Sequence, residues 1–151
     1  MNRKILLDLI GILLILLVVV VGYKLSPLLL PKSDLTVEPD AACNLQEGAC
    51  SASLPGGGRV TLTIGTRPIP LVKAFPLTVE AAGASRVEID FAGVDMDMGF
   101  NRPLLREDAP GLFSGEATLP VCVTGRMSWQ ATVLVDLPGS RVAIPFRFVT
   151  G

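Results

Sequence analysis

An apolar run near the amino terminus constrains this chain more than any other feature. The residues from Ile5 to Tyr23 are apolar or glycine apart from Asp8, and Arg3 and Lys4 precede them. An α-helix rises about 1.5 Å per residue, so these 19 positions span roughly the 30 Å hydrocarbon core of a bilayer. Asp8 lies near one edge of the run, where a short acid still reaches the headgroups. We therefore predict a transmembrane helix over residues 5–23.

This run fits an uncleaved signal-anchor better than a cleaved signal peptide. A signal peptide has an apolar stretch of about 7–15 residues followed by a small-x-small cleavage site. Here the run is longer, bulky Leu28–Leu30 follow it, and no Ala-x-Ala triplet appears there. The positive-inside rule then places residues 1–4 in the cytoplasm. We expect a single-pass protein of a bacterial inner membrane with its C-terminal domain in the periplasm.

Length and charge define what lies beyond the span. A proline-containing stalk (residues 24–40) leaves about 110 residues, 41–151, for one domain. Lysine and arginine number 13 against 14 acidic residues, and the cations are scattered singly, which argues against nucleic-acid binding.

Histidine is absent from the sequence. This removes the usual general base, the usual partner of a serine or cysteine nucleophile, and the commonest nitrogen ligand for zinc or Cu(II). We expect a protein that is not an enzyme and has no small-molecule substrate.

Apolar and polar residues alternate with period two after the stalk, in short runs separated by glycine and proline. Such alternation is typical of half-buried β-strands. The expected strands cover residues 60–64, 75–81, 87–91, 94–98, 117–123, 127–135 and 142–148. About seven strands without helical periodicity predict an all-β domain, an antiparallel β-sandwich of immunoglobulin-like type with Trp129 in its core. Pro55–Gly58 is expected to form a hairpin turn.

Three methionines are candidate metal ligands. In a strand, Met96 and Met98 would project from one face. Thioether sulfur favours Cu(I), and Met127 could supply a third ligand, with a cysteine thiolate as a further one. The alternative is that all three methionines fill gaps in the core. Clustering at a rim with Met127 or a free thiol would favour copper, and deep burial without nearby sulfur would favour packing.

The charged residues around these methionines are interpreted as solvated. Asp90, Asp95 and Asp97 lie without EF-hand spacing or further oxygen ligands, so neither a calcium site nor an acid/base pair is favoured. The segment Asn101–Pro103 is expected to turn the chain, with Arg102 as a solvated loop charge.

The chain has three cysteines, Cys43, Cys50 and Cys122. In an oxidising compartment two are expected to pair and one to remain. Three pairings are open, including a local loop between Cys43 and Cys50. Strict alternation points Cys122 outward, which favours a disulfide from it to the N-terminal segment. Cys43 and Cys50 lack Cys-x-x-Cys spacing, so a thiol redox protein is not favoured.

The order of features also resembles a known family. The anchor is followed by Met-Asp-Met-Gly (96–99), Gly-Leu-Phe-Ser-Gly-Glu-Ala (111–117), Gly-Arg-Met-Ser-Trp (125–129) and Pro-Phe-Arg-Phe (145–148). From Leu77 to Phe148 the chain is similar to the FixH and YtkA-like group of membrane-anchored bacterial immunoglobulin-like domains. The resemblance implies a role in copper handling or in the assembly of haem-copper oxidases.

The sequence departs from this family at one position. Such families commonly carry a histidine directly after the Met-Gly element, where this chain has Phe100-Asn101. Copper bound here would then be Cu(I), held by the methionines and a cysteine rather than by nitrogen.

Two hypotheses follow. The leading one is a membrane-anchored periplasmic accessory or assembly factor that handles Cu(I) for a respiratory or copper-dependent membrane complex. The alternative is a metal-free interaction module with a structural disulfide. It would present an edge strand or the 101–110 loop to a membrane-protein partner.

Overall fold

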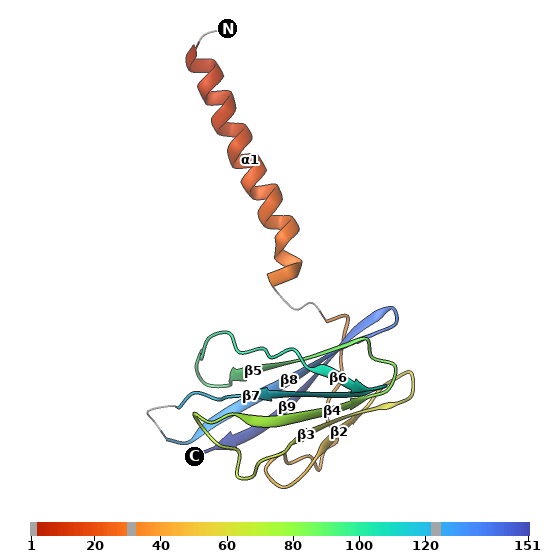
Figure 1. Cartoon of the computed structure of the whole chain (residues 1–151). Coiled ribbons are helices and arrows are strands. Elements are labelled where there is room, and N and C mark those ends of the chain that lie inside the picture. Colours follow the sequence, from red (N-terminus) through yellow and green to blue (C-terminus); the bar gives the residue numbers. More distant parts are fainter. Residues whose placement is uncertain (1–2, 30–32, 122–124) are drawn as a thin grey trace. The chain divides into compact units, whose positions relative to one another are not determined.

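The computed structural model describes residues 3–29, 33–121 and 125–151 and separates the chain into two units (Figure 1). Residues 1–32 form the first unit and residues 33–151 the second.

The first unit contains one apolar helix, α1 (Arg3–Leu29). Between Leu7 and Lys24 its mean hydropathy is 2.4, and apolar side chains lie on all sides of it. A helix that is apolar all round is suited to a lipid environment rather than to the surface of a soluble domain. Its length and composition are those of a membrane anchor or a signal sequence.

The second unit consists of two β-sheets. One sheet has the order β1 (Leu35–Thr36), β9 (Ser140–Thr150), β8 (Met127–Leu137), β5 (Arg86–Gly93). The other has the order β2 (Cys50–Ser53), β3 (Arg59–Ile64), β4 (Phe75–Ala81), β7 (Leu112–Ala117), β6 (Arg106–Ala109). Neighbouring strands are antiparallel except β1, which runs parallel to β9.

Alternating side chains of both sheets form one hydrophobic core. Its largest fully buried members include Trp129, Phe75, Phe91, Phe113 and Phe146. Phe75 and Phe91 meet edge to face across the two sheets, with ring centroids 6.2 Å apart. Trp129 is buried as predicted, and its indole N–H donates to the Thr150 hydroxyl at 2.9 Å. The indole therefore occupies the core without an unsatisfied donor.

Five of the expected strands are present, namely β3, β4, β5, β8 and β9. The Pro55–Gly58 turn is confirmed, because the Gly57 N–H donates to the Leu54 carbonyl at 3.0 Å between β2 and β3. The strands β1, β2 and β6 were missed. The first is only two residues long, β2 reads Cys-Ser-Ala-Ser, and every residue of β6 is exposed, so none shows clear alternation of apolar residues.

Two expected strands are wrong. The alternation at residues 94–98 is overridden by turn chemistry, because the Gly99 N–H donates to Asp97 Oδ1 at 2.8 Å and Gly99 has φ +77°. Within the expected strand at 117–123, residues 118–121 do not form a strand, because Pro120 removes a backbone donor and Val121 is exposed, and residues 122–123 lie outside the described residues. The strand β7 ends at Ala117 instead.

The segment before β6 covers the free edge of β5. The Phe91 N–H donates to the Asn101 carbonyl at 2.9 Å, and the Leu105 N–H donates to the Val87 carbonyl at 3.0 Å. The chain then crosses to the other sheet as β6. Gly115 on β7 leaves room for this crossing, since a Cβ there would lie 3.3 Å from Leu105 Cγ. An exposed sheet edge is thereby capped by the chain itself.

The chain enters the second unit beside Arg141. The Asp34 N–H donates to the Arg141 carbonyl at 2.8 Å, and the Arg141 N–H donates to Asp34 Oδ2 at 2.8 Å. The Arg141 guanidinium also donates to Asp136 across the β8–β9 hairpin, with Nη2 2.9 Å from Oδ2. These hydrogen bonds hold the pKa of Asp136 below its ordinary value and raise the pKa of Arg141.

Replacing Asp136 by asparagine should therefore lower the free energy of unfolding by about 1 kcal/mol at neutral pH. A depressed carboxyl pKa stabilises the fold above the unfolded-state value of about 3.9, and this contribution is lost as pH falls through the folded-state pKa. Urea denaturation between neutral and acidic pH should show the gap between wild type and Asp136→Asn closing on acidification. Glu47→Gln, at an exposed position, is the control. A gap that stays constant to the lowest pH would contradict this coupling.

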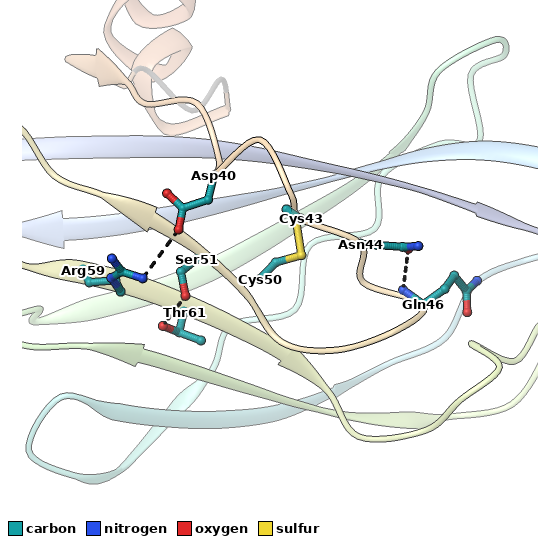
Figure 2. The surroundings of a disulfide bond; sticks show 8 residues. All are labelled: Asp40, Cys43, Asn44, Gln46, Cys50, Ser51, Arg59 and Thr61. Carbon is teal, nitrogen blue, oxygen red and sulfur yellow. Dashed lines mark hydrogen bonds and ion pairs between the residues drawn. A yellow bond between two sulfur atoms is a disulfide. The ribbon is translucent and has the colours of Figure 1, made fainter.

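Cys43 and Cys50 form a disulfide, with Cα atoms 5.1 Å apart (Figure 2). We call residues 43–50 the disulfide loop. Within it the Gly48 N–H donates to the Asn44 carbonyl at 3.0 Å, and Leu45 is fully buried. The expected link from Cys122 to this segment is wrong, because its two cysteines are bonded to each other. Cys122 itself lies outside the described residues.

Reduction of this bond, or the double change Cys43→Ser with Cys50→Ser, should destabilise the second unit by about 2–3 kcal/mol, because the short cross-link restricts the unfolded chain. Thermal unfolding with and without reductant measures the effect. Cys122→Ser is the matched control and should leave the difference between oxidised and reduced protein unchanged. Equal melting temperatures in both redox states would refute the stabilising role.

Candidate functional site

The methionine cluster, defined as Met96, Met98 and Met127, gathers at the end of the first sheet where β5 ends and β8 begins. Met127 is the first residue of β8, pairs in register with Thr150, and is 5% exposed. Met98 is partly buried against the core, and Met96 is 40% exposed. The exposure of the three side chains therefore increases from buried Met127 through partly buried Met98 to exposed Met96.

Gly93, the last residue of β5, is the point at which this cluster converges. A Cβ atom on Gly93 would overlap Met127 Cε and the Met96 carbonyl oxygen and would lie 3.1 Å from Met98 Cγ. In both methionine side chains the sulfur is bonded directly to the named carbon. Two thioether groups from different elements thus flank one spot above the backbone of Gly93.

The loop after Gly93 shapes a hollow around this spot. Residues 92–99 line a cavity of about 380 Å³. The Val94 N–H donates to the Ser128 carbonyl at 2.9 Å, which ties the start of the loop to β8. The Asp97 turn then brings the chain back past Met98. Although the expected strand is absent, the side chains of Met98 and Met127 still come together over Gly93, and Met96 brings its backbone carbonyl to the same place.

Gly93 was missed by the sequence reasoning. A glycine that ends a strand pattern often marks close approach of another chain segment, and this was the available signal. Met96 is 40% exposed at the rim, which is the placement that we took to favour copper. Met127 and Met98 both pack against the core, as the packing alternative expects.

The cysteines do not extend this cluster in the described residues. Cys43 and Cys50 are oxidised to a disulfide, so neither offers a thiolate, and that part of the expectation is wrong. Cys122 lies outside the described part of the chain. Within residues 3–29, 33–121 and 125–151, no group of three or more histidine, cysteine or acidic side chains is placed to hold a metal ion.

Arg102 differs from its expected role as a solvated charge. Its side chain is only 13% exposed, and its Nε lies 3.3 Å from Asp90 Oδ1. Its guanidinium carbon stands 4.9 Å from the centroid of the Phe100 ring, a cation–π distance. Asp90 therefore serves as a structural counter-ion that anchors the edge segment to β5. Phe100 remains 78% exposed beside it.

The second unit is thus an all-β domain whose methionine cluster lies at one end of its first sheet, and it follows an apolar N-terminal helix. Comparisons of the chain with protein-family models, with curated proteins and with solved structures found no match. Function is therefore inferred from the residues themselves.

Gly93→Ala should push Met127 and Met98 apart and destabilise the domain by about 1–3 kcal/mol, because the new methyl group overlaps a backbone oxygen that cannot move freely. Urea denaturation measures the change. Gly56→Ala is the matched control, since a Cβ there meets nothing within 4 Å. If both variants unfold at the same urea concentration, the convergence at Gly93 is not as described.

Proposed function

We propose that this protein is a membrane-anchored periplasmic accessory factor that binds Cu(I) through the methionine cluster and serves a respiratory or copper-dependent membrane complex. The observation that carries the proposal is the convergence of Met98 and Met127 over Gly93, with Met96 on the same loop. Thioethers are soft ligands that select Cu(I) among biological metal ions. The absence of histidine from the sequence removes the usual nitrogen ligands of Cu(II).

The gradient of burial suits transient binding. Met127 is fixed in the core and can hold an ion, whereas the more exposed Met96 lies at the rim, where a donor or acceptor protein can reach it. Few ligands and an open rim favour exchange over permanent storage. An accessory factor needs this combination in order to pass an ion on.

Strand order supports an immunoglobulin-like class for the domain. If β3 to β9 are named A to G, one sheet reads A-B-E-D and the other C-F-G. These are the two sheets of an immunoglobulin constant domain. The strands β1 and β2 are additions at the edges. The same class is implied by the resemblance to the FixH and YtkA-like group.

The apolar helix supports the proposed location of the protein in a membrane. Arg3 and Lys4 precede it, and the positive-inside rule retains such residues in the cytoplasm. The disulfide between Cys43 and Cys50 is consistent with an oxidising compartment for the second unit. Together these features favour an exported domain on a membrane anchor whose N-terminal end lies in the cytoplasm.

A metal-free interaction module is the second candidate. Phe100 is 78% exposed, Leu104 is 57% exposed, and Val94 is 48% exposed, all near the end of β5 or along its edge. Exposed apolar residues of this size are common in protein interfaces. In this alternative the methionines only pack, and a membrane partner covers these residues.

Titration of the detergent-solubilised full chain with Cu(I), in competition with a Cu(I)-specific chromogenic chelator under anaerobic conditions, separates the two candidates. Wild type should bind one Cu(I). The pair Met98→Leu with Met127→Leu, and the pair Met96→Leu with Met98→Leu, should each weaken binding at least tenfold, because each removes two thioethers. Met and Leu are close in volume, so folding should persist and is checked by thermal unfolding.

The control is Val94→Leu, a change in the same loop that removes no sulfur and should leave Cu(I) affinity unaltered. Affinities that are equal in wild type and both double variants would exclude the methionine cluster as a copper site. The interaction module would then become the leading interpretation.

A further inference from the structure

A second hollow, separate from the methionine cluster, lies beside the last residues of β9. Its volume is about 890 Å³, within the usual range of small-ligand sites. Its lining comes from four segments that are distant in sequence: the disulfide loop, residues 68–71, Arg126 before β8, and residues 147–151. We call it the β9 hollow. None of the three clustered methionines lines it.

The floor of the β9 hollow is apolar. Ile69 is 4% exposed and Phe148 is 5% exposed, and both belong to the core. Leu71 is partly buried and packs against the same core. A ligand with a small apolar body would rest against the small part of this apolar surface that remains exposed.

The wall formed by the disulfide loop is held in place before any ligand binds. Gln46 Nε2 donates to the Val149 carbonyl at 2.6 Å, and Gln46 Oε1 accepts from the Ile69 N–H at 3.3 Å. The Cys43–Cys50 bond closes the loop behind it. Figure 2 shows the side chains of Asn44 and Gln46 on the side of the disulfide away from Arg59. A preformed wall lowers the ordering cost of binding.

The loop that carries Leu71 is also constrained. Val72 has φ +60°, a left-handed conformation that a β-branched residue rarely adopts. Its N–H donates to the Leu119 carbonyl at 2.8 Å, which holds this conformation. Residues kept in such conformations concentrate at ligand sites.

Two arginines give the β9 hollow its charge. Arg126 and Arg147 line it, and none of the lining side chains that the structure describes is acidic. Neither arginine forms an ion pair with a described carboxylate, although Arg147 Nε lies 3.5 Å from Gln130 Oε1. By contrast, the hollows beside Arg59 and Arg106 each include a glutamate.

We propose that the β9 hollow binds a carboxylate joined to a small apolar group, with Arg126 and Arg147 receiving the carboxylate and Ile69 and Phe148 contacting the apolar part. Guanidinium groups match carboxylates in geometry and charge. The carboxylate can belong to a free organic acid or to an acidic side chain of a polypeptide. The β9 hollow shares no lining residue with the proposed copper site, so either proposal can fail without the other.

The test uses the full chain in nanodiscs of phosphatidylcholine, with calorimetric titration of two probes: 3-phenylpropionate and the peptide acetyl-Leu-Asp-Leu-amide. The uncharged 3-phenylpropionamide is the matched control ligand. Trp129, the single tryptophan, reports independently, because its indole donates to Thr150, which lines the hollow. Fluorescence should change on binding and saturate with the calorimetric signal.

At least one carboxylate probe should bind, and Arg126→Gln with Arg147→Gln should weaken it at least tenfold. Arg59→Gln, beyond the disulfide loop, should bind as wild type. If the double arginine variant weakens binding of the peptide alone, the carboxylate belongs to a polypeptide. If it weakens binding of 3-phenylpropionate, the site accepts a free organic acid. Binding of neither probe, equal affinity for the amide, or equal affinity in the double arginine variant would overturn the proposal.

Discussion

The pairing of β8 with β9 is the constraint on which the rest of the domain depends. Its register runs without interruption from Met127 opposite Thr150 to Leu137 opposite Ser140. One slip by a single residue would turn every inward side chain outward, because side chains alternate along a strand. This register buries Trp129 beside its acceptor Thr150, and it brings Arg141 to Asp136 at the hairpin end.

The two candidate binding regions share one end of this pair. Met127 and Thr150 are directly opposite each other, and Met127 belongs to the methionine cluster while Thr150 lines the β9 hollow. The Trp129–Thr150 hydrogen bond lies close to both. Structural roles occupy the other end, where Asp34, Asp136 and Arg141 fasten the chain entry. The domain thus separates its attachment from its chemically unusual residues.

Alternation of apolar residues predicted the long strands well, because burial of one face dominates their energetics. It failed where local hydrogen bonding competes, as at Asp97 and Gly99, and where a strand is exposed throughout, as in β6. The three candidate methionines were named from sequence, whereas the convergence of Met98 and Met127 at Gly93 was not. The burial of Arg102 and the β9 hollow also escaped prediction, since both depend on contacts between residues far apart in the chain.

The entry of the chain beside β9 sets a length scale for whatever the domain handles. Leu35 pairs with Val142, whereas Met127 pairs with Thr150, so eight steps of β9, about 27 Å, separate the tethered end from the methionine cluster. A tethered domain searches only the volume that its own dimensions allow, at a high effective concentration inside it and none outside. If the apolar helix anchors the domain as proposed, the strand length of β9 sets how far from the entry of the chain the methionine cluster can meet another molecule.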